Sequence, residues 1–158
     1  MKYSLFHICI AVLICSCNQP AGLTDAERTT KATEARQMLV GYNDDIREHG
    51  LLAEFAYLDS SAQFFWVPPG YTSPLSFDTV AKIMRANAAV IKKMDNRWDT
   101  LIVNVLSSDI ATYTGKLHST ITDTAGKIFN THLIESGTMI KRKDGWKLLS
   151  GQTAAIPN

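Results

Sequence analysis

Hydrophobic residues between positions 24 and 50 recur every three or four residues. Thr24 and Glu27 form a T-x-x-E capping box before this run, and Gly50 follows it. A capping box satisfies the free amide groups at a helix start, and glycine favours a helix end, so we predict a helix over residues 25–48. The apolar residues that follow predict a short second helix over 51–58.

The next stretch combines a strand pattern with a helix pattern. Residues 62–67 are mostly aromatic and apolar, and the prolines directly after them end a predicted strand. Ser76 can cap a helix, and apolar residues at helical spacing predict this helix over 77–94. Asn87 falls on its apolar stripe, so we expect its side-chain amide to point toward the interior.

After Asn96 the hydrophobic period changes from helical spacing to two, which is typical of strands. The links between the predicted strands are short and turn-like, so neighbouring strands are expected to be antiparallel. This order predicts an α+β fold, in which a cone-shaped curved antiparallel sheet packs against two main helices and one short helix. The four predicted strands span residues 98–106, 110–122, 128–142 and 146–153.

The first residues have the composition of an export signal. Lys2 precedes an apolar run over residues 5–15, which as a helix would rise about 16 Å, too little for a hydrocarbon core of about 30 Å. Ile14-Cys15-Ser16-Cys17 then resembles the lipobox of bacterial lipoproteins, which implies cleavage before Cys17 and lipid on its thiol. An ordinary signal peptide with an incidental cysteine is the alternative. The predicted parts are a signal peptide (1–16), a tether (17–23) and a folded domain (24–158).

Charge and cysteine content limit the functions of the chain. It carries 16 basic and 15 acidic residues, which gives a net charge of +1. Loss of the signal peptide would remove a single charged residue, Lys2. Such a chain is not expected to bind nucleic acid, and we expect membrane contact only through the lipid anchor. All three cysteines lie in the first seventeen residues. We expect an exported bacterial lipoprotein, periplasmic or on the cell surface, without a cofactor or a metal ion.

Several local patterns resemble the nuclear transport factor 2-like superfamily, in particular its SnoaL-like and exported bacterial branches. They are the amphipathic first helix, Tyr57-Leu58-Asp59 before the first strand, Pro68-Pro69-Gly70-Tyr71 before the third helix, and residues 138–148 with Asp144-Gly145-Trp146-Lys147. The resemblance covers residues 24–153. It implies a conical fold with a pocket at the open end and, frequently, a homodimer formed through the sheet. It implies little about chemistry, because the same cone hosts isomerases, dehydratases, association domains and binding proteins.

Turn lengths predict which strand residues face the pocket. A three-residue link at 143–145 and a four-residue link at 123–126 place His132 on the inner face and Glu135 on the outer face. His132 is the leading candidate, because a neutral imidazole can donate, accept or take up a proton near pH 7. A core histidine bonded to a neighbouring hydroxyl is the alternative. The predicted pocket residues are Tyr113, His132, Ser136, Asn87, Gln152, Tyr57 and Trp66.

Three functions remain open at this point. The first is a domain that binds a small, partly apolar molecule in the cone, which the mixed inner face favours. The second is a SnoaL-like isomerase, dehydratase or hydrolase with His132 or Asp99 as general base, since no other inward acid is predicted. The third is a dimeric protein-interaction module.

Overall fold

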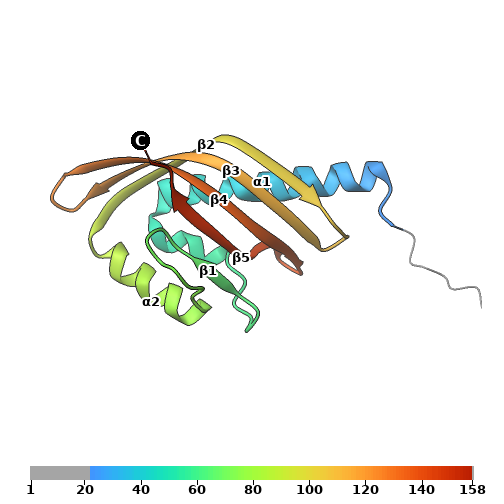
Figure 1. The fold of residues 1–158 in the computed structure, drawn as a ribbon, viewed down its shortest axis with the longest axis horizontal. Coiled ribbons are helices and arrows are strands. Elements are labelled where there is room, and N and C mark those ends of the chain that lie inside the picture. The colour runs from blue at the N-terminus through green and yellow to red at the C-terminus, as the bar shows by residue number, and fades with distance from the viewer. Residues whose placement is uncertain (1–21, 158) are drawn as a thin grey trace, which may run out of the picture.

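The computed structural model describes residues 22–157, in which helices lie on one side of a curved sheet (Figure 1). Cys17 and the predicted export segment lie outside these residues. The predicted α+β cone with two main helices and one short helix is confirmed. The helical elements are α1 (Asp25–His49), the 3₁₀ helix η1 (Leu51–Ala56) and α2 (Phe77–Ala88). The strands are β1 (Phe65–Val67), β2 (Ile91–Val105), β3 (Ile110–Asp123), β4 (Ile128–Arg142) and β5 (Gly145–Ala155).

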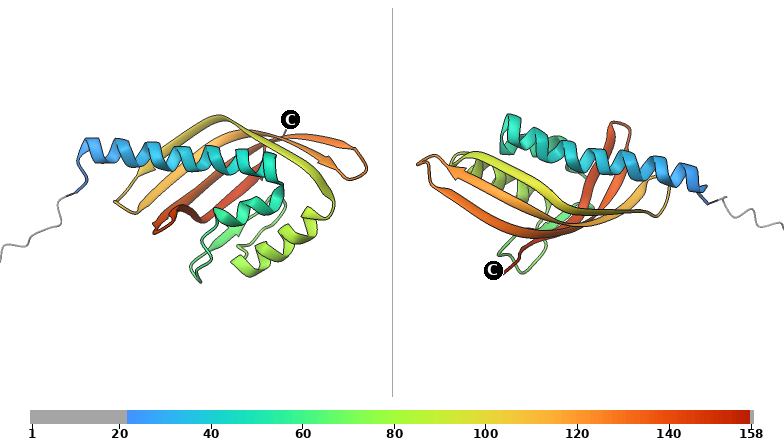
Figure 2. Two further views of the ribbon diagram at one scale, coloured as in Figure 1. Left: turned by 180° about the vertical axis from the view of Figure 1, so that it is seen from behind. Right: turned by 90° about the horizontal axis from the view of Figure 1, so that it is seen from above.

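Helix α1 forms as predicted, because both of its ends are satisfied locally. The Thr24 hydroxyl accepts a hydrogen bond from the Glu27 amide at 3.3 Å, and the Glu27 carboxylate accepts one from the Thr24 amide at 2.9 Å. Gly50 follows the helix with a φ of 87°, which glycine adopts without strain. Figure 2 shows α1 running along one face of the sheet. Its buried residues are Ala35, Leu39, Tyr42, Asn43 and Ile46.

The third predicted helix and the first predicted strand are much shorter than expected. The helix capped by Ser76 ends at Ala88 rather than at residue 94, and the chain from Ile91 onward pairs with β3. The apolar spacing here fits either element, and pairing with β3 decides for a strand because it satisfies the backbone amides and carbonyls. β1 contains only Phe65–Val67 and runs parallel to β5. The sheet order is β1-β5-β4-β3-β2, and all other neighbours are antiparallel.

The predicted pairing of β2 with β3 is confirmed, but that of β3 with β4 is wrong by one residue. Val103 pairs with Tyr113, as expected. The link between β3 and β4 spans residues 123–127 rather than 123–126, so Gly115 pairs with Glu135. A shift of one residue turns every side chain of a strand to the other face. Glu135 therefore points toward the helices, and His132 points away from them.

Local hydrogen bonds account for the longer link. The Asp123 amide donates to the Lys127 carbonyl at 3.0 Å, and the Asp123 carboxylate accepts from the Lys127 amide at 2.8 Å. At the other end of β4 the turn contains only residues 143 and 144, not the predicted 143–145. A bulge at Leu149 then restores the predicted pairing for the rest of β5.

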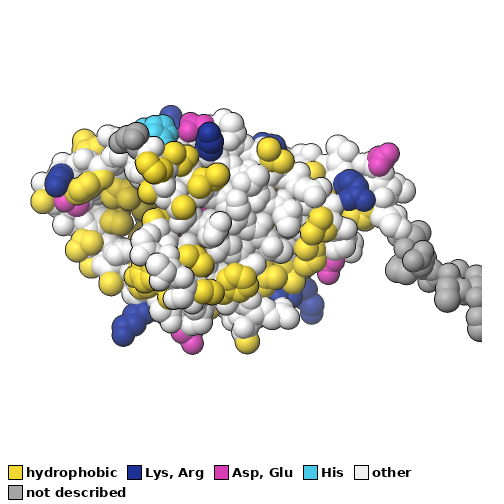
Figure 3. Space-filling view, in the orientation of Figure 1, with side chains coloured by type: hydrophobic (Ala, Val, Ile, Leu, Met, Phe, Trp, Pro, Cys, Tyr) yellow, Lys and Arg dark blue, Asp and Glu magenta, His cyan; other side chains and the backbone are white. Residues whose placement is uncertain are grey.

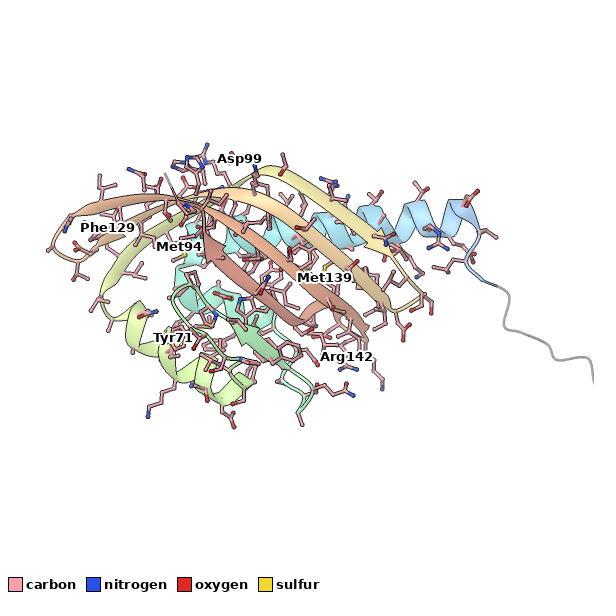
Figure 4. All side chains as sticks on the ribbon, viewed as in Figure 1. Tyr71, Met94, Asp99, Phe129, Met139 and Arg142 are labelled. Carbon is pink, nitrogen blue, oxygen red and sulfur yellow. The ribbon has the colours of Figure 1, made fainter. Side chains whose placement is uncertain are left out.

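The hydrophobic core lies between α1 and the sheet. Leu39 and Ile46 of α1, together with Met139 and Leu148 of the sheet, are almost completely buried. Figure 4 shows Met139 in the middle of the sheet and Arg142 at the end of β4. Within residues 22–157 no helix is both long and apolar enough to cross a membrane.

Candidate functional site

A cavity of about 410 Å³ lies between the sheet, η1 and α2. Its exposed lining residues Pro69, Asn87 and Ala155 mark the mouth. Figure 3 shows hydrophobic side chains gathered at the end of the molecule where α2 and the β3–β4 hairpin lie. The cavity has the size and the mostly apolar wall that are typical of ligand pockets. The apolar wall includes Leu51, Val80, Met84, Met94, Leu117 and Leu133.

Two carboxyl groups interrupt this apolar wall. Glu54 comes from η1 and Glu135 from β4, and both line the cavity. The Tyr42 hydroxyl donates to Glu54 Oε1 at 3.1 Å, and the Tyr113 hydroxyl donates to Glu135 Oε1 at 2.7 Å. Glu135 is only 6% exposed. Among residues 22–157, no lysine, arginine or histidine belongs to the cavity lining.

The surroundings raise the pKa of both carboxyl groups. Burial, followed by repulsion from the Glu135 charge, raises the pKa of Glu54 to about 7. Burial also raises the pKa of Glu135, although its hydrogen bonds from Tyr113 and Thr153 act in the opposite direction. Burial and the nearby carboxylates hold the pKa of Tyr42 well above its usual value. Glu54 is therefore a group that can gain or lose a proton near neutral pH.

A short hydrogen-bond chain supports Glu135 from β1 and β5. The Trp66 indole Nε1 donates to Thr153 Oγ1 at 3.1 Å, and the Thr153 hydroxyl donates to Glu135 Oε2 at 3.0 Å. Gly137 and Gly151 leave space for the Trp66 ring. A Cβ at Gly151 would lie 2.6 Å from Trp66 Cη2, and one at Gly137 would lie 3.3 Å from the same atom. These glycines therefore let Trp66 lie close to the sheet.

Two asparagines carry buried polar atoms without hydrogen-bond partners. Within the described part of the chain, Asn96 Oδ1 is buried without a hydrogen-bond partner, and Asn96 lines the cavity. Asn43, which follows Tyr42 in α1, is 4% exposed and has neither side-chain atom paired. Buried polar groups are normally hydrogen-bonded, so the unpaired Asn96 Oδ1 is an exception at the wall of the cavity. Nothing in the structure explains the unpaired amide of Asn43.

Of the predicted pocket residues, Trp66 and Asn87 lie on the cavity wall. Tyr113 is buried, and its hydroxyl holds Glu135. Tyr57 lies outside this cavity, in a depression beside α1 and the β4–β5 turn, where its hydroxyl donates to the Asp45 carboxylate.

The predicted inward positions of His132, Ser136 and Gln152 are wrong, because the one-residue shift and the bulge place them on the outer face. His132 Nδ1 lies 3.7 Å from Asp99 Oδ2, and both side chains are about half exposed. Figure 4 shows Asp99 at the edge of the molecule, on the side away from α2. Ser136 and Gln152 line a shallow depression on the outer face. The two predicted general bases, His132 and Asp99, thus lie outside the cavity.

The sequence reasoning missed both carboxyl groups of the cavity. Glu54 carried a usable signal, because it is the single charged residue in the segment 51–56, which is otherwise apolar. Glu135 could not be recognised from the sequence without the correct length of the link between β3 and β4, because the register of β4 decides which face Glu135 occupies. Among residues 22–157 no group of three His, Cys, Asp or Glu side chains is arranged to hold a metal ion.

Solved structures with similar folds support the predicted nuclear transport factor 2-like fold. A candidate scytalone dehydratase from Novosphingobium aromaticivorans superposes with a TM-score of 0.74 at 9% identity, over 85% of this chain and 89% of its own. A nuclear transport factor 2-like superfamily protein from Salmonella enterica gives a TM-score of 0.70 at 15% identity, over 82% and 94%. A hexachlorocyclohexane dehydrochlorinase, LinA-type3 from Novosphingobium barchaimii, gives a TM-score of 0.67 at 8% identity, over 85% of this chain and 92% of its own.

These likenesses establish the fold, since identities of this size carry no more than that. No family model matches the sequence, and no curated protein matches it. The chain therefore has the nuclear transport factor 2-like cone, with a cavity whose carboxyl pair must be interpreted from its own geometry.

Proposed function

We propose that the domain binds a small, largely apolar molecule in the cavity beneath η1 and α2. The observation that carries the proposal is the cavity itself, about 410 Å³ with an apolar wall and a few inward polar groups. Apolar walls provide affinity, and a small number of fixed polar groups provide orientation. The core beside the cavity is tightly buried, so the cavity is a local feature and not a sign of loose packing throughout.

Binding is tested with Nile red, a neutral apolar dye whose emission increases when it leaves water. Ile83 lines the cavity, and the adjacent Lys82 is exposed on the same helix. We expect Ile83→Trp to weaken dye binding at least about tenfold, because the larger ring occupies the cavity, and Lys82→Trp to leave it unchanged. Native mass spectrometry of the protein purified from its own host then identifies any retained compound. Failure of the wild-type protein to bind Nile red and to retain any compound would count against the proposal.

A second candidate function is acid–base catalysis of the isomerase or dehydratase type. It is favoured by Glu54, whose pKa of about 7 suits a group that takes a proton and returns it. Structurally similar proteins that are named as a dehydratase and a dehydrochlorinase support considering this chemistry. The test is turnover of the compound retained from the host. Under this hypothesis Glu54→Gln abolishes turnover while the compound still binds.

We also propose that the domain is exported and tethered to a membrane through lipid on Cys17. The support is the lipobox-like sequence and the position of α1, which begins at Asp25, a few residues after the cysteine.

A homodimer formed through the outer face of the sheet remains a prediction. Ile102 and Ile134 are exposed, at 65% and 42%, as apolar residues of β2 and β4. Light scattering of the purified domain tests it, and a monomer at high concentration would contradict it.

A further inference from the structure

We propose that the ligand of the cavity is a small lipophilic amine, whose ammonium group binds the carboxyl groups of Glu54 and Glu135. This inference rests on the proposed function and names the chemical class of the ligand. It depends on three features of the site: its charge, the direction of its hydrogen bonds and its unpaired acceptors.

The charge of the cavity is not balanced by the protein. Elsewhere the buried carboxylate of Asp59 accepts two hydrogen bonds from the Arg142 guanidinium, at 3.0 and 2.8 Å. Glu135 is about as buried as Asp59, at 6% and 7% exposure, but among the described residues its donors are the hydroxyl groups of Tyr113 and Thr153 alone. In the part of the chain that the structure describes, no lysine, arginine or histidine lines the cavity. A buried carboxylate without a cation is unfavourable, so a cationic ligand would supply what the protein does not.

The hydrogen-bond chain from Trp66 keeps one oxygen of Glu135 as an acceptor. An indole N–H can only donate, so Thr153 Oγ1 must accept from Trp66 and turn its own proton elsewhere. That proton goes to Glu135 Oε2, at 3.0 Å. Oε2 is therefore held without a proton, and the chain favours the ionised carboxylate that an ammonium group requires.

The cavity offers further acceptors that lack donors. Within the described residues, Glu54 Oε1 accepts from Tyr42, while Oε2 has no hydrogen bond. Asn96 also belongs to the lining, and its Oδ1 lies buried without a partner just behind the cavity surface. An ammonium group has three donors and no acceptor, so it matches this set better than a hydroxyl or a carboxylate does. The rings of Tyr42 and Trp66 in the same wall suit a cation as well.

The protonation of Glu54 gives the inference a pH dependence. The titratable groups that line the cavity are Glu54, Glu135 and Tyr42, and Tyr113 contacts Glu135 from behind the wall. Because the pKa of Glu54 is about 7, its charge increases between pH 6 and pH 8. An aliphatic ammonium group remains protonated over this range. Amine affinity should therefore increase from pH 6 to pH 8.

The test compares three ligands that share an indole ring and differ in the charge of the side chain. They are tryptamine, a cation; tryptophol, a neutral alcohol; and indole-3-acetate, an anion. Isothermal titration of the purified protein at pH 8 should give tryptamine at least about tenfold tighter than tryptophol, with indole-3-acetate the weakest. Glu54→Gln should remove most of this preference. The control Glu48→Gln removes an exposed carboxylate of α1 and should retain it.

The possible results separate the two proposals. If tryptophol binds as tightly as tryptamine, or if Nile red binds and tryptamine does not, the amine inference is overturned and the ligand cavity stands. A tryptamine preference that persists in both Glu54→Gln and a folded Glu135→Gln also overturns it, because the charge that selects the amine then lies elsewhere. If neither Nile red nor any of the three indoles binds, the proposed function fails together with the inference.

Discussion

Replacement of Glu54 by glutamine should make the protein more stable, relative to wild type, at pH 8 than at pH 5. The raised pKa means that the folded protein holds a proton on Glu54 between about pH 4.5 and pH 7, where the unfolded chain has released it. The free energy of unfolding therefore falls as pH rises through this range. Glutamine carries no titrating proton and can still accept the hydrogen bond from Tyr42, so the variant lacks this loss.

The size of the effect follows from the two pKa values. The interval from 4.5 to about 7 corresponds to about 3 kcal/mol, at about 1.4 kcal/mol for each pH unit. Glu54 is partly exposed, and some of the titration lies outside a range of pH 5 to pH 8. We therefore expect the unfolding free energy of Glu54→Gln, relative to wild type, to rise by about 2 kcal/mol between these pH values.

Urea unfolding followed by tryptophan fluorescence at pH 5 and pH 8 measures this change. Titrating groups far from Glu54 affect both proteins alike, so the difference between variant and wild type reports on Glu54 and its coupling to Glu135. Glu48→Gln provides the control, because it removes an exposed carboxylate of the neighbouring helix and should show no such difference. If the free energies of Glu54→Gln and wild type change in parallel from pH 5 to pH 8, Glu54 does not titrate near neutrality and the reasoning about the cavity is refuted.

Three further predictions concern the ion pair, the glycines and the anchor. Asp59→Asn should lower the free energy of unfolding by about 2 kcal/mol at pH 7, because Arg142 loses its charged partner. Since Arg142 lowers the pKa of Asp59, urea unfolding should show no difference between variant and wild type once the pH falls below that pKa. Gly151→Ala should destabilise by about 2 kcal/mol or more, since its Cβ would lie 2.5 Å from the Ser136 carbonyl oxygen and 2.6 Å from Trp66. By contrast, Gly41→Ala should stabilise the protein by about 1 kcal/mol, because Gly41 lies inside α1 and its Cβ would contact nothing closer than 3.9 Å. Equal melting temperatures for Gly151→Ala and Gly41→Ala would contradict the packing argument. Cys17→Ser should abolish incorporation of labelled palmitate and release the protein from the membrane fraction, whereas palmitate incorporation in the variant would exclude Cys17 as the lipid site.

Local chemistry made much of the fold predictable. The capping box at Thr24 and the glycine at position 50 mark the two ends of α1, because these residues satisfy the backbone groups at a helix end without help from the rest of the molecule. The pairing of β2 with β3 was likewise predictable, since alternation in both strands and a short link leave one register with a buried apolar face.

The candidate site depended on information that is not local. Residues 128–142 alternate so that both faces mix apolar and polar side chains, and the hydrophobic pattern therefore does not choose between them. The choice depends on one residue of link length between β3 and β4, which changes the local energy little but turns every side chain of the strand over.

The sequence alone thus determined which segments are helices and strands, because propensity, capping and hydrophobic period act within a few residues. The tertiary structure decided that Glu135 rather than His132 faces the cavity. It did so through contacts between distant segments: Tyr113 of β3 and Thr153 of β5 bond the carboxylate, and Gly151 admits the Trp66 ring that orients Thr153. A buried acid needs such partners from several strands at once, and no single stretch of sequence contains them.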